Sequence, residues 1–299
     1  MWPTLIRKYK KLFKLSLFIV GFMLAKSFCE DKTKGFTFTA IDQNIPYDAS
    51  LTTHSNFDPK VLAQPFRFLD RGGQSYVFVS EDKTLVIKFF KKQYHIPDAL
   101  IHALDSSLPG FLKERRFEFL KTRNERFYPI FESCKIAREH LQEETGVCYL
   151  HFNPTKDLSP LEVIDNLGIH YLVDLNTTSF IVQKYAERIF TKMEEQLANN
   201  DVEGAKKLIH SVFEYIQKRS AQGIRDNDNG LRRNYGCQDN KAVSLDVGSF
   251  VLDDSLKEPL TAQMELERKT KQLGQWLADN HPELVPYFNE QGAVYGNSN

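Results

Sequence analysis

The stretch GIRDNDNGLRRNYGCQDNKAVSLDVGSF (residues 223–250) gathers carboxylate and amide side chains into one short polar run. Its candidate functional residues are Asp226, Asp228, Asn234 and Asp246. Mg²⁺ is usually held by one or two carboxylates together with phosphate oxygens, and a further carboxylate can orient an attacking hydroxyl and accept its proton. Asn and Asp also satisfy their own backbone in ordinary loops, which is the competing interpretation. The features upstream of the stretch favour a site for metal and phosphate.

Upstream, a polar segment gives way to three β-rich runs. The runs FRFL, SYVFVS and TLVIKFF lie within residues 66–90 and are separated by DRGGQ and EDK, which predicts a meander of antiparallel strands. Gly72 and Gly73 lie in the first of these turns, where the absence of Cβ atoms lets backbone N–H groups approach phosphate oxygens. A plain hairpin turn explains two glycines equally well, so they decide nothing on their own.

The third run contains a lysine. Lys88 stands in the apolar run LVIKFF, where an unpaired ammonium is costly. Binding of nucleotide phosphates would explain it, and an outward-facing strand position is the alternative. Residues 96–126 are predicted to be helical, and a helix glutamate could pair with this lysine. We choose Glu114 for that role, with Glu118, one turn away on the same face, as the second choice.

The rest of the chain shifts from strand patterns to helix patterns. Further strands are predicted at VCYLHFNP, IHYLVDL and SFIVQKY, and helices over residues 190–222 and 261–290. A strand-rich half therefore precedes a helix-rich half, which indicates the α+β class. A cleft between two such halves is a natural place for a ligand.

Taken together, these features resemble the protein-kinase-like fold family over about residues 66–250. The motif DRGGQSYV is similar to the glycine-rich loop of that family, with Asp70 and Ser75 in place of two glycines, Gly72 as the retained one, and Val77 at the position that covers the adenine.

Two more motifs extend the resemblance. LVIK is similar to the family's strand-three lysine motif, which implies that Lys88 binds phosphates and that Glu114 pairs with it. SFIVQKYAER is similar to the strand that enters the hinge, which makes Gln183, Lys184 and Tyr185 the implied neighbours of the adenine.

The resemblance also assigns roles within residues 223–250. LDVG is similar to the family's Asp-Phe-Gly, which implies that Asp246 and Asn234 hold magnesium. Two registers are open for the residue that orients the acceptor hydroxyl. Reading IRD as His-Arg-Asp implies Asp226, and counting from the preceding glycine implies Asp228. The second register needs the shorter insertion before Asn234, so we favour it.

The fold implied by the resemblance has two lobes, an antiparallel β N-lobe over about residues 64–186 and a reduced helical C-lobe over about 187–299. The implied cofactors are ATP and Mg²⁺, and the implied activity is phosphotransfer to a hydroxyl acceptor or protein partner that the sequence does not identify. No Ala-Pro-Glu motif follows DVG, so the layout is closer to small-molecule or lipid-sugar kinases. The alternative is a catalytically inactive kinase-like binding module, exported or membrane-anchored.

The N-terminal residues 1–29 contain six basic residues and no acidic one. LSLFIVGFMLA (15–25) is typical of a signal-peptide core or an anchor, and it is shorter than the roughly 20 apolar residues of a full membrane span. We therefore expect export, secretion or inner-membrane anchoring, with membrane contact through residues 12–28, and a cytoplasm-facing domain as the alternative. Residues 30–63 are expected to form a linker or extension before the domain at 64–299.

Composition narrows the choice of partners. The formal charge of the chain is zero, and the basic N-terminus leaves the remainder with an excess of acidic residues, so nucleic acid is not an expected partner. The four cysteines have no CxxC spacing and are too scattered for a zinc site, which favours free or core thiols.

Overall fold

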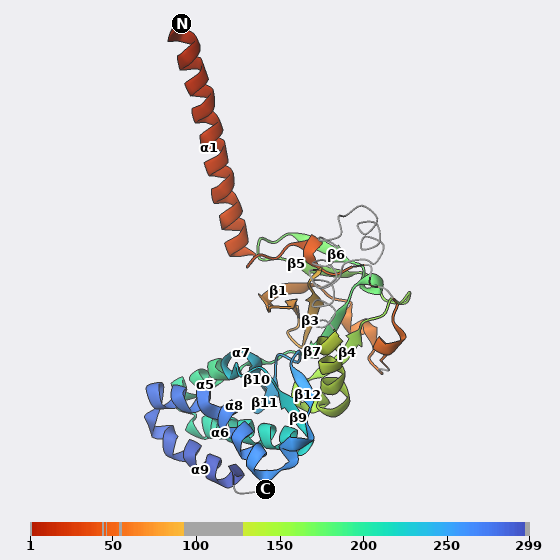
Figure 1. The fold of residues 1–299 in the computed structure, drawn as a ribbon, viewed down its shortest axis with the longest axis vertical. Helices are drawn as coiled ribbons and strands as arrows, with labels where there is room; N and C mark the ends of the chain where they lie inside the picture. Colours follow the sequence, from red (N-terminus) through yellow and green to blue (C-terminus); the bar gives the residue numbers. More distant parts are fainter. Residues whose placement is uncertain (1, 44, 46, 54–55, 93–127, 297–299) are drawn as a thin grey trace, which may run out of the picture.

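A computed structural model describes residues 2–43, 45, 47–53, 56–92 and 128–296. The chain is of the α+β class, as predicted, and Figure 1 shows its strands and its C-terminal helices gathered in different parts of the molecule. The predicted helix over 96–126 lies outside the described residues.

A seven-stranded sheet forms the first part, in the order β4-β7-β3-β2-β1-β5-β6. The three predicted strands are confirmed and pair antiparallel as a meander. The strands of the sheet are β1 (Phe66–Arg71), β2 (Ser75–Ser80), β3 (Leu85–Phe90), β4 (Val147–His151), β5 (Leu161–Ile164), β6 (His170–Val173) and β7 (Phe180–Lys184).

One pairing differs from the predicted antiparallel sheet. β5 lies beside β1 in parallel, so the sheet is mixed. The four-residue run LEVI was not predicted as a strand, because it is too short to show a clear period. A parallel neighbour needs a long crossover, and the chain between β1 and β5 supplies one.

The segment expected to be a linker packs onto the sheet. Phe36 is 3% exposed and contacts the rings of Phe68, Tyr76 and Phe78 in the core under the sheet. Ile41 and Leu62 are buried in the same core. Short 3-10 helices connect these contacts, at η1 (Phe38–Ala40), η2 (Ala49–Leu51) and η3 (Pro59–Leu62). Burial of these apolar side chains stabilises the sheet.

The second part is built from helices and two small sheets. β8 (Glu187–Arg188), β10 (Tyr235–Gln238) and β11 (Lys241–Ser244) form one, and β9 (Ile224–Asp226) pairs with β12 (Phe250–Leu252) in the other. The helices are α5 (Ile189–Ala198), α6 (Val202–Ala221), α7 (Leu231–Asn234), α8 (Pro259–Asn280) and α9 (Val285–Gly296), with 3-10 turns η6 (Asp254–Lys257) and η7 (Pro282–Leu284).

Two predicted helices are each divided in two. The helical stretch over 190–222 breaks between α5 and α6, where Asn200 adopts a left-handed backbone with φ of 59°, a conformation that asparagine tolerates better than most residues. The stretch over 261–290 breaks at Pro282, which lacks the N–H needed to continue a helix. The helices from these two stretches pack together around Leu208, Val212 and Leu273.

Residues 128–140, which are helical, and the short α4 (Gln142–Thr145) lie between the two parts, while η5 (Leu175–Thr177) connects β6 to β7. A third apolar cluster joins Phe131 and Val147 to Val247 and Phe250, so it connects the sheet to the second part. Cys29, Cys134 and Cys237 are free thiols, of which Cys134 and Cys237 are buried.

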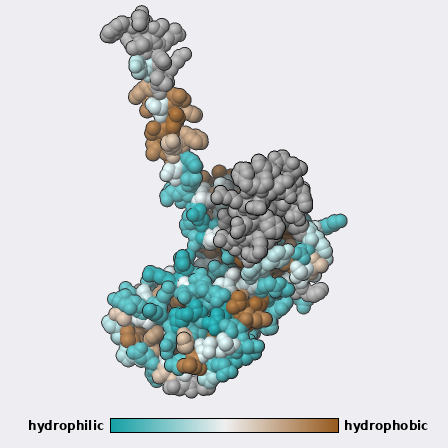
Figure 2. Space-filling model, viewed as in Figure 1, coloured by the Kyte–Doolittle hydropathy of each residue, from teal (hydrophilic) through white to brown (hydrophobic). Residues whose placement is uncertain are grey.

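α1 (Trp2–Lys32) projects away from the rest of the chain (Figure 1). Figure 2 shows an apolar band along it, formed by exposed side chains from Phe13 to Phe28. Among the described residues, no helix combines the length and the apolar character needed to cross a membrane. The expected signal peptide or anchor stays a prediction.

Candidate functional site

A pocket of about 660 Å³ lies where the seven-stranded sheet meets the helical part. Its volume is in the range of ordinary small-molecule sites. Of the residues predicted from the sequence, the structure brings the following to this pocket: Gly72, Gly73, Val77, Lys88, Gln183, Lys184, Tyr185, Asp228, Asn234 and Asp246. Asp226 does not line it, and Glu114 and Glu118 lie outside the described residues.

Lys88 points from β3 toward the helical part. Its Nζ donates a hydrogen bond to the carbonyl oxygen of Leu245, the residue before Asp246. Burial lowers the pKa of the Lys88 ammonium, while the negative charge of Asp246 acts in the opposite direction. The charge therefore lies in a partly buried position beside a carboxylate, where an anionic ligand would gain from it. Val77 is its direct neighbour across β2 and β3.

The turn between β1 and β2 covers the pocket. Lys91 Nζ donates to the Gly72 carbonyl at 2.5 Å and to the Gly73 carbonyl at 3.2 Å. The backbone carbonyl oxygens of this turn are therefore bound by the Lys91 ammonium. The next residue, Gln74, reaches the segment after Asp246. A Cβ placed on Gly248 would lie 2.7 Å from Gln74 Oε1, so the glycine makes room for this contact.

The mouth of the pocket carries an ion-pair cluster. Asp70 accepts from Arg188 Nη2 at 2.7 Å and from Lys34 Nζ at 2.9 Å. Burial raises the pKa of the Asp70 carboxyl, but these contacts and the Arg71 N–H outweigh it and lower the pKa overall. The cluster joins β1, β8 and the turn that follows α1.

The predicted adenine neighbours lie at the end of β7. The Gln183 Nε2 donates to the carbonyls of Thr145 and Ser244, and its Oε1 has no hydrogen-bond partner among the described residues. Tyr185 N donates to the Thr84 carbonyl, which fixes the chain as it leaves the sheet. Apolar walls on the same pocket come from Val86, Ile181 and Val247.

Asp228 and Asn234 flank Gly230. A Cβ on this glycine would lie 3.1 Å from Asp228 Oδ1 and 3.4 Å from Asn234 Nδ2. Burial raises the pKa of the Asp228 carboxyl, and the Asn234 amide, the Gly230 N–H and nearby cations including Arg233 together lower it by more. Asp228 is therefore a carboxylate at neutral pH that faces the pocket.

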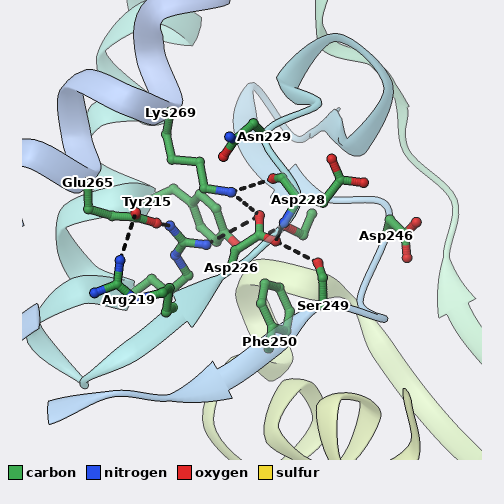
Figure 3. A network of polar contacts seen from close by, with 12 residues as sticks. Tyr215, Arg219, Asp226, Asp228, Asn229, Asp246, Ser249, Phe250, Glu265 and Lys269 are labelled. Atoms are coloured by element: carbon green, nitrogen blue, oxygen red, sulfur yellow. Dashed lines mark hydrogen bonds and ion pairs between the residues drawn. The ribbon is translucent and has the colours of Figure 1, made fainter. Parts of the chain in front are cut away.

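Asp226 is separated from the pocket by its burial. β9 alternates so that Ile224 and Asp226 point inward, and Asp226 is 2% exposed. Its carboxylate contacts Lys269 Nζ at 2.8 Å, Ser249 Oγ at 2.6 Å and Arg219 Nη1 at 3.4 Å. Figure 3 shows it inside this network, with Asp228 at the edge. The two aspartates that the sequence left as alternatives thus occupy different environments.

The predicted magnesium ligands both line the pocket. Asn234 ends the short helix α7, and the exposed carboxylate of Asp246 follows β11 and accepts from Gly248 N at 3.1 Å. Among the described residues, no three His, Cys, Asp or Glu side chains gather to hold a metal by themselves. The oxygens present suit Mg²⁺ when phosphate completes the coordination.

Several residues that pack behind the pocket, around Asp226, were missed by sequence reasoning. Arg219, Glu265 and Lys269 are buried ionic side chains around Asp226. A signal for two of them exists in the sequence: Lys269 falls between Leu266 and Leu273 on the apolar stripe of α8, and Arg219 continues the stripe of α6. A charged residue on such a stripe needs a buried partner.

No protein-family model and no curated protein matches the chain. Solved structures of WbdD, described as a bifunctional kinase-methyltransferase, are weakly similar. A medium-resolution structure has 16% identity and a TM-score of 0.33, covering 74% of this chain and 43% of that chain. A high-resolution structure has 15% identity and a TM-score of 0.35, covering 76% and 46%. The chain thus spans less than half the length of these WbdD chains.

Proposed function

We propose that this chain is an ATP- and magnesium-dependent phosphotransferase with a two-lobed, protein-kinase-like fold. One observation carries the proposal: a lysine on the sheet and three oxygen-bearing side chains from the helical part, more than a hundred residues later, line a single pocket. These are Lys88, Asp228, Asn234 and Asp246. Pockets with convergent polar groups between two structural parts are typical ligand sites.

The proposed roles follow from charge and position. Lys88 binds phosphate oxygens, and its hydrogen bond to the Leu245 carbonyl shows that its reach extends to the segment carrying Asp246. Asn234 and Asp246 would hold Mg²⁺, which supplies neutralisation of charge on the transferred phosphoryl group. Glu114 remains the predicted partner of Lys88.

Asp228 has the properties of the residue that orients the acceptor. Its lowered pKa keeps it ionised at neutral pH, so it can accept a hydrogen bond from a hydroxyl and take the proton as the new oxygen–phosphorus bond forms. Asp226 does not have this role in the proposal, because its carboxylate is surrounded by Lys269, Ser249 and Arg219.

The second candidate is a kinase-like binding module without turnover. Asp70 favours it, because this residue replaces a loop glycine and ties the loop to Arg188 across the mouth of the pocket. A closed mouth would slow exchange of a nucleotide, and it suits a protein that binds and holds its ligand.

Two measurements on the full chain separate these candidates. Mg-ATP is expected to raise the melting temperature of the wild type, because a ligand that binds only the folded state stabilises it. Lys88→Met should weaken Mg-nucleotide binding at least ~10-fold by removing the phosphate-binding charge. Lys241→Met is the control, since Lys241 is an exposed strand lysine that does not line the pocket.

Turnover then distinguishes the two. Release of ADP that depends on Asp228 supports the phosphotransferase, and tight Mg-ATP binding with no ADP release in the presence of an extract of hydroxyl-bearing metabolites supports the binding module. Absence of any stabilisation by Mg-ATP would reject both.

The proposal also assigns α1 to contact with a membrane surface, anchored or exported as the sequence predicts. The exposed apolar side chains between Phe13 and Phe28 support this role, because such a band is costly in water. Flotation with lipid vesicles is expected for the full chain, and its loss in Phe18→Ser with Phe22→Ser. Equal flotation of both proteins would contradict it.

A further inference from the structure

We propose that Lys269, acting through Asp226, is a positioning residue that holds Asp228 and the segment after Asp246 in place from helix α8. The expected effect of Lys269 on catalysis rests on the proposed function, whereas its expected effect on the turn that carries Asp228 does not. Neither residue touches the pocket, so both act through other groups.

Lys269 contacts the backbone and the side chain of one short turn. It is fully buried in α8, and its Nζ lies 2.8 Å from Asp226 Oδ2. The same Nζ donates to the carbonyl oxygen of Asp228. One ammonium group therefore ties both ends of the turn from Asp226 to Asp228 to the helix, as Figure 3 shows.

Asp226 extends this connection to the other side of the site. Its Oδ1 accepts from the backbone N–H of Asp228 at 2.9 Å and from Ser249 Oγ at 2.6 Å. Ser249 is three residues after Asp246, and its own carbonyl accepts from Asn227 N at 3.0 Å. The Asp226 carboxylate thus adds a side-chain link to the backbone pairing that joins the turn carrying Asp228 to the segment following Asp246.

The charges around Asp226 balance. Arg219 lies 3.4 Å from Asp226 Oδ2 and donates to Glu265 at 2.6 Å, so two buried cations face two buried anions. Glu265 also binds Arg268, whose Nη2 donates to the Asp226 carbonyl at 2.8 Å. Removing one member alone leaves an uncompensated buried charge, which is strongly unfavourable. A test must therefore keep the charges balanced.

The double variant Asp226→Asn with Lys269→Met meets this requirement. It removes one anion and one cation, and the Asn oxygen can still accept from the Asp228 N–H and Ser249. What is lost is the Lys269 ammonium, with its hydrogen bond to the Asp228 carbonyl and its ion pair with Asp226. Lys271→Met is the matched control, because Lys271 is an exposed lysine on the same helix.

Hydrogen exchange without nucleotide provides the first readout. In the double variant, the amides of residues 226–231 are expected to exchange at least ~10-fold faster, with the core strand β3 unchanged. The control should exchange as the wild type does. Exchange of residues 226–231 at the wild-type rate in the double variant would overturn the inference.

Two additions keep the test decisive. If the double variant does not fold, Ser249→Ala removes only the bond from Ser249 to Asp226 and is expected to accelerate exchange at 246–250. Unchanged exchange there would count against the inference.

If the wild-type protein turns over ATP, the double variant should have a kcat ~10-fold or more below the wild-type value, with KM for nucleotide within ~2-fold. A wild type that binds no Mg-nucleotide rejects the proposed function, and the exchange result still decides the inference.

Discussion

Asp70 Oδ2 lies 2.7 Å from Arg188 Nη2, so an ion pair joins the end of β1 to the first strand after the chain leaves the seven-stranded sheet. Both residues line the mouth of the pocket. About a third of the Asp70 side chain and about half of the Arg188 side chain are exposed, and exposed ion pairs contribute only about 0–1 kcal/mol to stability. The effect of this pair should therefore be on opening of the mouth and not on folding.

We expect Asp70→Asn to accelerate dissociation of Mg-nucleotide about 3- to 10-fold, with little change in melting temperature, since the bond across the mouth loses its charge. Stopped-flow with a fluorescent ATP analogue measures the rate. Glu81→Gln is the control, because it weakens an ion pair with Arg67 on the same sheet, away from the pocket. Equal dissociation rates for Asp70→Asn and the wild type would show that the pair does not gate the pocket.

The pH dependence of nucleotide binding should report the environment of Lys88. Burial lowers its pKa below the usual 10.5, so in the free protein the ammonium loses its proton at a lower pH than an exposed lysine does. Affinity for Mg-nucleotide should therefore decline as pH rises, and the decline should begin at a lower pH than an exposed lysine would give. Isothermal titration calorimetry from pH 7 to 10 measures the decline. Lys88→Arg, whose charge persists over this range, should flatten the profile, and a wild-type profile equally flat would argue against phosphate binding by Lys88.

The two aspartates should respond differently to the same change. Asp228→Asn is expected to lower turnover at least ~100-fold with stability within about 1 kcal/mol of the wild type, because its side chain faces the pocket. Asp226→Asn leaves the buried Lys269 without its carboxylate partner and removes one of the two carboxylates beside Arg219, so it should lower the free energy of unfolding by about 3–5 kcal/mol. Urea unfolding and ADP release measure the two effects. A loss of stability in Asp228→Asn and not in Asp226→Asn would reverse the assignment.

Phe36→Ala should destabilise the sheet by about 3–5 kcal/mol, the usual cost of removing a buried phenylalanine ring. The ring packs between Phe68, Tyr76 and Phe78, so its loss leaves a cavity in the core. Phe57→Ala, which removes a partly buried ring stacked on Tyr149, is a milder comparison. A change below about 1 kcal/mol for Phe36→Ala would mean that residues 30–63 are dispensable for the sheet.

The parts of the fold that the sequence predicted are those with a sustained period. β2 buries every second residue, and α6 repeats its apolar stripe over 20 residues, so both are visible as patterns. β5, β9 and β12 have four residues or fewer, and pairing with distant strands determines them. Phe36 lies in GFTFTAI, whose alternation is too brief to predict a strand or a buried core contact.

The sequence predicted the residues that line the candidate site, but it did not predict the buried residues that hold them in place. Lys88, Asp228, Asn234 and Asp246 follow local motifs, and the structure places all four on one pocket. The choice between Asp226 and Asp228 depends on which of the two side chains points into the protein interior. The local sequence does not determine that direction. Lys269 is contributed by an element far along the chain, and only its place on an apolar stripe distinguished it.

The reach of Lys269 has a consequence for synthesis of the protein. Its ammonium binds the carbonyl of Asp228, which precedes it by 41 residues. During translation the turn at Asp228 leaves the ribosome well before α8, and Asp226 has no buried cation from that helix until α8 docks. The site is completed only once α8 has been made and has docked, so a nascent chain that stops short of α8 lacks the contact between Lys269 and the Asp228 carbonyl.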